Sequence, residues 1–72
     1  MSKDTEKHIL ELELKKRETI CSASKRKLDK YQRANSRVFN AVSQDEIDDV
    51  KLEIKTQELE IEILKTKIGD IK

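Results

Sequence analysis

The ten residues AVSQDEIDDV (residues 41–50) decide whether the chain forms one long helix or turns back on itself. Ser43 and Glu46 make the S-x-x-E pattern of a helix N-terminal capping box, and Val42 and Ile47 occupy the positions of a hydrophobic staple around it. Acidic residues fill the turn that follows, where the helix dipole favours anions. This pattern predicts that a helix begins within the stretch.

An apolar heptad pattern follows from this point to the end of the chain. Its positions alternate intervals of three and four residues, as the buried positions of a coiled-coil helix do. They are Ile47, Val50, Ile54, Gln57, Ile61, Leu64, Ile68 and Ile71. The segment ELEIEI also alternates with the period of a strand, but only over a few residues, so a helix is favoured.

A looser heptad pattern precedes the stretch. Its positions are Leu10, Leu14, Arg17, Cys21, Ser24, Leu28, Tyr31, Asn35, Val38 and Val42, and Ile20, Ala34, Phe39 and Ala41 widen it. The step from Val42 to Ile47 breaks the frame in a way that the usual coiled-coil insertions of three or four residues do not. We therefore predict a single all-α domain over residues 1–72, an antiparallel two-helix hairpin with coiled-coil-like packing. Its helices cover about 4–41 and 44–71, with a turn at about 40–44.

Charge also favours an antiparallel hairpin. Residues 1–42 hold 11 basic and 6 acidic residues, whereas residues 43–72 hold 5 basic and 9 acidic residues. Folding back sets a basic helix beside an acidic one. A tight turn then places Cys21 against Ile68 and the Tyr31 phenol beside the Gln57 amide, and about the first ten residues extend past the second helix.

The totals favour a small module that a partner completes. A chain of 72 residues rarely gains more than about 3–5 kcal/mol from its own core, so we expect oligomerisation or a protein partner. No signal peptide pattern and no apolar run near the ~18 residues of a membrane span are present. The single cysteine leads us to expect a reducing, cytoplasmic setting.

Nothing in the sequence predicts catalysis. His8 is the one histidine, and Cys21 stands at a heptad position, where a buried structural cysteine is the favoured interpretation. No glycine-rich phosphate loop or metal-ligand spacing occurs. We expect no enzyme active site, no cofactor, no metal and no small-molecule substrate.

Two surfaces are candidates for binding. Leu52, Leu59 and Ile63 lie about 160° from the second heptad, and exposed apolar rows of this kind mark binding surfaces. With Ile9 and Leu12 they predict a face for an amphipathic helix of a protein partner. The alternative is a homo-oligomer that buries both faces of the helix.

A basic stripe on the first helix gives a rival interpretation. Arg26, Lys30, Arg33 and Arg37 recur at helical spacing, so they share one face. Such a stripe can follow phosphates in a nucleic-acid-binding hairpin dimer, or it is a solvated face or a match for an acidic partner. A structural homo-oligomeric coiled coil, with one helix running through Ser43, is the remaining alternative.

The short hairpin, its apolar second helix and the ending Gly69-Asp70-Ile71-Lys72 resemble the small co-chaperones of type III secretion needle subunits. The resemblance implies that the hairpin pairs with a helical-repeat chaperone and that the two keep a needle subunit monomeric. It carries over no site residues. The function that we expect is therefore a chaperone-like or adaptor-like protein-interaction module.

Overall fold

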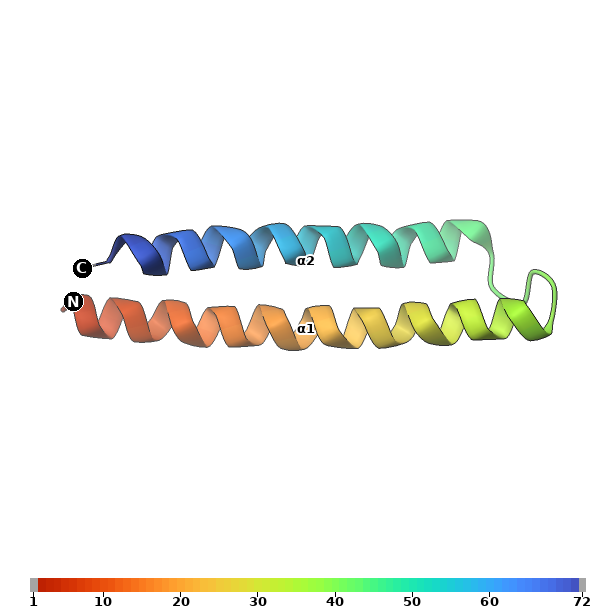
Figure 1. Cartoon of the computed structure of the whole chain (residues 1–72), viewed down its shortest axis with the longest axis horizontal. Coiled ribbons are helices and arrows are strands. Elements are labelled where there is room, and N and C mark those ends of the chain that lie inside the picture. Colours follow the sequence, from red (N-terminus) through yellow and green to blue (C-terminus); the bar gives the residue numbers. More distant parts are fainter. Residues whose placement is uncertain (1, 72) are drawn as a thin grey trace.

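The computed structural model describes residues 2–71 as two helices that pack side by side in opposite directions (Figure 1). Helix α1 covers Lys3–Arg37 and helix α2 covers Gln44–Asp70. The predicted all-α hairpin is confirmed, and it is a thin rod of 54 × 14 × 14 Å. Met1 and Lys72 lie outside the described residues. They are the first and last residues of the predicted domain, and Lys72 also ends the segment Gly69-Asp70-Ile71-Lys72 that contributes to the resemblance.

The turn is held by side-chain hydrogen bonds from both helices. The Asn35 side chain accepts from the Val42 backbone N–H at 2.8 Å and donates to the Val42 carbonyl at 3.1 Å. At the start of α2, the Ser43 side chain accepts from the Glu46 backbone N–H at 3.2 Å, as the capping pattern predicts. Between them, Asn40 adopts a positive φ of 56°, which asparagine tolerates better than most residues.

Helix α1 ends four residues earlier than the predicted residue 41. Val38 leaves the helix in an extended conformation while its N–H still bonds to the Ala34 carbonyl. Because Asn35 binds the backbone of Val42, the chain has to reverse within the intervening residues, and the helix cannot continue. Val38 and Phe39, which the heptad placed beside the core, are therefore exposed.

The two heptad patterns form the line of contact between the helices, which we call the seam. Ile47, Val50, Ile54 and Leu64 of α2 are buried, as are Cys21 and Ser24 of α1. The other described heptad positions from Leu10 to Asn35 and from Gln57 to Ile71 are half-buried. A seam between only two helices leaves its edges in water, which explains why so few side chains are fully covered.

The register of the seam differs from the predicted one. Cys21 clusters with Ile54 and lies beside Ile61, one to two heptads nearer the turn than the predicted Ile68. The reason is the connection Val38–Ser43, which is longer than the assumed turn and begins earlier. Each residue of α1 therefore meets a part of α2 that is closer to the turn.

The same shift changes a predicted pair and removes the predicted overhang. Gln57 Oε1 accepts from Arg17 Nη1 at 3.5 Å, while Tyr31 packs against the buried cluster nearer the turn. The start of α1 lies beside the end of α2 (Figure 1), so Ile9 and Leu12 are not on a free extension. The phenol and the amide thus do not form the expected pair.

Candidate interaction surfaces

An exposed apolar row runs along the side of α2 that faces away from α1. The row consists of Leu52, Leu59 and Ile63, which are 66%, 47% and 47% exposed. At about 100° per residue, these positions lie roughly opposite the buried side of the same helix. A shallow hollow there is lined by Leu59, Glu62, Ile63, Thr66 and Lys67. The hairpin therefore leaves one side of α2 with apolar groups that no other part of the described chain covers.

Ile9 and Leu12 are also exposed, but they do not join this row. Leu12 lies about 160° from both Leu10 and Leu14, which belong to the seam. It therefore points away from α2. The five residues predicted as one partner-binding face lie on two different helices, and the α2 row and Leu12 lie on opposite sides of the rod.

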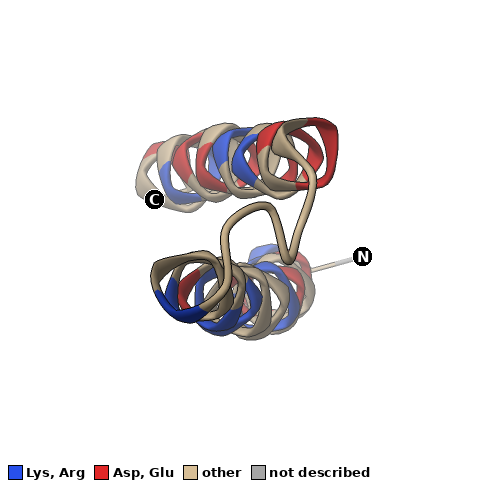
Figure 2. Cartoon of the chain, turned by 90° about the vertical axis from the view of Figure 1, so that its right-hand side faces the viewer, with Lys and Arg blue, Asp and Glu red and all other residues tan. Residues whose placement is uncertain are grey.

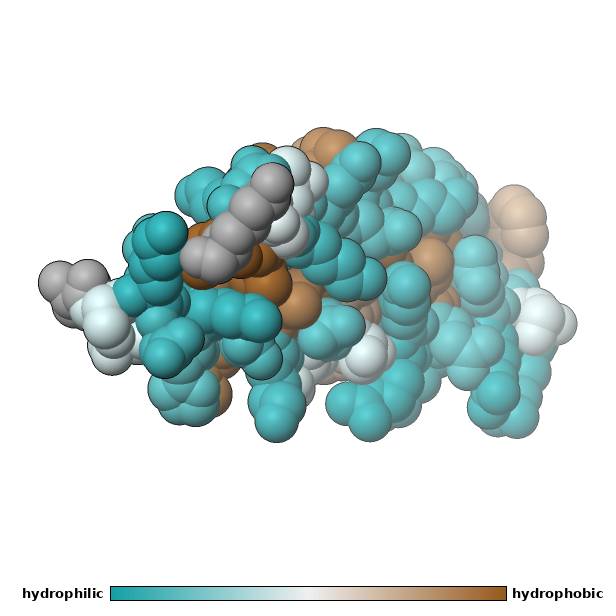
Figure 3. All heavy atoms as spheres, turned by 60° about the vertical axis from the view of Figure 1, so that its left-hand side comes forward, coloured by the Kyte–Doolittle hydropathy of each residue, from teal (hydrophilic) through white to brown (hydrophobic). Residues whose placement is uncertain are grey.

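Figure 3 shows how hydropathy is distributed over one face of the molecule. Hydrophilic residues cover most of it. Hydrophobic residues gather between the helices, at the end where the termini lie, and others stand at the upper edge along α2. The first group belongs to the incompletely covered seam, and the second lies on the side of α2 away from α1.

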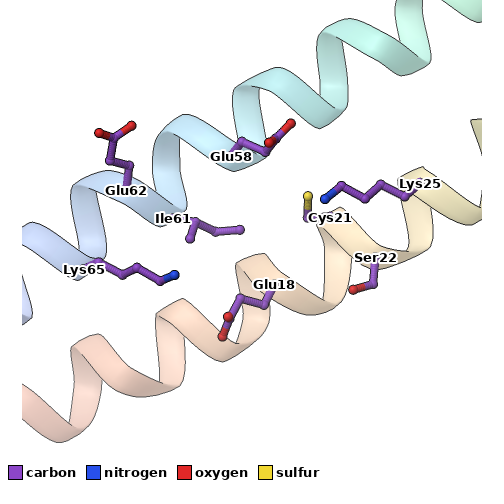
Figure 4. Close-up of a pocket in the computed structure, with 8 residues that line it drawn as sticks. All are labelled: Glu18, Cys21, Ser22, Lys25, Glu58, Ile61, Glu62 and Lys65. Atoms are coloured by element: carbon purple, nitrogen blue, oxygen red, sulfur yellow. The ribbon is translucent and has the colours of Figure 1, made fainter.

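A second hollow opens between the helices, near the middle of the seam (Figure 4). It is lined by Glu18, Cys21, Ser22, Lys25, Glu58, Ile61, Glu62 and Lys65. The Cys21 thiol is free and buried, and it packs with Val50 and Ile54 as a seam residue. Acidic and basic side chains of both helices line the rest of the hollow. Among residues 2–71, no three His, Cys, Asp or Glu side chains are grouped so that they could hold a metal ion.

The basic stripe lies on the outer side of α1 and is exposed at all four positions, Arg26, Lys30, Arg33 and Arg37. Figure 2 shows Lys and Arg along the outside of α1 and Asp and Glu prominent on α2. The one ion pair within the described chain joins Arg33 to Asp29 at 3.0 Å, inside α1. Among the described residues, the basic charge of α1 and the acidic charge of α2 therefore form no ion pair across the seam.

The tip of the hairpin carries two exposed hydrophobic residues that the heptad analysis assigned to the core side. Phe39 is 90% exposed and Val38 is 62% exposed. The sequence signal that could have identified them is Asn40, because asparagine is enriched at positive φ and marks a turn. The heptad pattern continues through these residues to Val42 and so predicts helix where the chain turns.

A comparison of the chain with protein families, curated proteins and solved structures finds no match. Within residues 2–71, neither helix is apolar enough over a sufficient length to cross a membrane. The exposed surfaces of the hairpin, chiefly the apolar row of α2 and the basic side of α1, therefore carry the functional proposals.

Proposed function

We propose that the chain is a protein-interaction module, whose apolar row on α2 packs against an amphipathic helix of a protein partner or of a second copy. The observation that carries this proposal is the exposure of Leu52, Leu59 and Ile63 on a helix whose opposite side already forms the seam. Full burial of an aliphatic side chain contributes about 1.5–3 kcal/mol. Covering three half-exposed ones supplies on the order of 3 kcal/mol.

The surroundings of the row support a helix as the bound element. Glu62, Thr66 and Lys67 line the hollow beside Leu59 and Ile63, which gives the apolar centre a polar rim. The row runs straight along α2, so a partner helix with apolar residues at matching intervals can lie beside it. Helix α2 would then be the central helix of three.

The resemblance seen in the sequence supports a narrower form of this proposal. In that form the hairpin is a co-chaperone of a type III secretion needle subunit, and its partner is a helical-repeat chaperone. The buried free Cys21 is compatible with the reducing cytoplasm that we propose as its location. The contact surface is the apolar row of α2 in either form.

The test separates association from folding. We expect Leu59→Glu to abolish association while the helical circular dichroism remains, because Leu59 is about half exposed and lies on the side of α2 away from the seam. Association is measured as mass by light scattering over a concentration series, and as anisotropy of a labelled amphipathic helical peptide. Lys51→Glu, an exposed charge reversal on the same helix, is the matched control and leaves both readouts unchanged.

Leu64→Glu is the opposite control, because Leu64 is buried in the seam. It should remove the helical signal together with association. If Leu59→Glu unfolds the chain as Leu64→Glu does, the row is part of the core. If it leaves both association readouts at the level of the unmodified chain, the row is not the contact surface.

A further inference from the structure

The outer side of α1 carries a row of side chains that is longer than the basic stripe. At intervals of three and four residues, this basic row consists of Lys15, Thr19, Ser22, Arg26, Lys30, Arg33 and Arg37, and all seven are exposed. These intervals keep the members on one side of the helix. At about 1.5 Å per residue, the row is roughly 33 Å long. It holds five cations, two hydroxyl groups and no carboxylate.

The field along this row is positive and little compensated. Arg33 is the one member of the row that forms an ion pair, with Asp29, and both side chains are more than half exposed. Glu11 and Glu18 lie about one helical turn from Lys15 but form no ion pair with it. The seam turns the other side of α1 towards α2, so the thickness of α1 separates the acidic residues of α2 from the row (Figure 2). Complementary charge therefore comes from outside the hairpin, from counterions or from another molecule.

We infer that the basic row binds the phosphate backbone of double-stranded nucleic acid without regard to base sequence. Protein interfaces contain an apolar core, and helices that lie on a membrane insert an apolar side. The row itself offers neither, since the side chains between its cations are Thr19 and Ser22, and the exposed Leu12 on that side of α1 lies before its first member. A duplex needs no apolar contact, because release of its counterions drives binding to cations.

The shape of the row favours a duplex over a single strand. Single strands are held by aromatic side chains on which bases stack, and the row contains none. A duplex carries one phosphate charge per about 1.7 Å of its axis, but these phosphates wind around the axis, so a straight row of roughly 33 Å reaches them where it crosses the two backbones. The long Lys and Arg side chains of the row can extend to phosphates on either side of these crossings.

This surface is independent of the proposed protein-binding surface. The basic row and the apolar row of α2 lie on opposite sides of the hairpin, with the seam between them. A duplex on α1 leaves Leu59 uncovered. Both partners can therefore be bound at the same time, and each surface can be tested without the other.

The experiment measures the affinity of the full chain for a fluorescent 20-base-pair DNA duplex by anisotropy, over a series of salt concentrations. The logarithm of affinity should fall with the logarithm of salt concentration, with a slope of about −0.9 for each phosphate neutralised. We expect Arg26→Gln/Lys30→Gln/Arg37→Gln to reduce the magnitude of that slope by about 3 and to lower the affinity at low salt by at least tenfold. Duplexes of unrelated sequence should behave alike.

The matched control is Lys51→Gln/Lys55→Gln/Lys65→Gln, which removes the same charge from exposed positions of α2. It should lower affinity far less. Equal losses in the two triple variants would show that only net charge matters and would overturn the inference. Tighter binding to phosphatidylserine vesicles or to polyglutamate than to the duplex, lost in the α1 variant, would overturn it in favour of a membrane or an acidic protein.

Discussion

Asn35 occupies a heptad position of α1, yet its side chain serves the turn as well as the seam. Its amide makes two hydrogen bonds with the backbone of Val42. Without them, the N–H and C=O groups of Val42 would have to form their hydrogen bonds with water. The heptad pattern correctly predicts that this position faces inwards. It does not show which backbone group the amide meets, because that depends on the path of the turn.

Asn35→Ala should lower the free energy of unfolding by about 1–3 kcal/mol, since two hydrogen bonds of about 0.5–1.5 kcal/mol each are lost. Urea denaturation followed by circular dichroism measures this change. Gln32→Ala is the control, because Gln32 lies on the same helix but is exposed, and its substitution should change stability by less than about 0.5 kcal/mol. Equal values for the two variants would mean that the amide does not hold the turn.

The two helices differ in how well their ends can be predicted. The start of α2 follows from local signals, since Ser43 caps a backbone N–H three residues further on, and α2 begins at the predicted residue 44. The end of α1 has no glycine to close it. The end of α1 is instead set by the hydrogen bonds between Asn35 and Val42, which are seven residues apart. The heptad pattern cannot predict a hydrogen bond of this kind.

Register is the other feature of the helices that the sequence does not determine. The positions that form the seam were predicted correctly from Leu10 to Asn35 and along α2. The length of the connection decides which seam position of α1 packs against which seam position of α2. A shift of one heptad changes the packing little, because the same kind of position recurs every seven residues. An assumed tight turn therefore misplaced Cys21 by one to two heptads, although its burial was predicted.

Ser43→Ala should lower the free energy of unfolding of the hairpin by about 1 kcal/mol, because the first turn of α2 loses its N-cap. Ser36→Ala is a suitable control. The Ser36 hydroxyl donates to the Arg33 carbonyl on an exposed part of α1, so its loss leaves no buried group without a partner. Thermal unfolding of both variants gives the comparison, and a cap that contributes nothing would make their melting temperatures equal.

The whole molecule is a rod with two unlike sides. The sequence indicated both the apolar row of α2 and the basic stripe of α1, because each has a clear helical spacing. It could not show that Leu12 belongs to the basic side rather than to the apolar row, since that placement requires the direction in which α1 faces α2. The folded hairpin therefore presents the apolar row and the basic row on opposite sides, so the two proposed partners would not compete for one surface.

That arrangement depends on the hairpin forming within one chain, and a distance measurement tests this directly. Lys25 and Glu58 line the same hollow from different helices, so spin labels at these two exposed positions should lie within about 10–20 Å, given axes roughly 8–10 Å apart. One continuous helix would separate them by about 50 Å. An antiparallel dimer of continuous helices could also bring labels close, but only between chains. Diluting the labelled chain with unlabelled chain should therefore leave the short distance unchanged, and its disappearance on dilution would show that the pairing is between molecules.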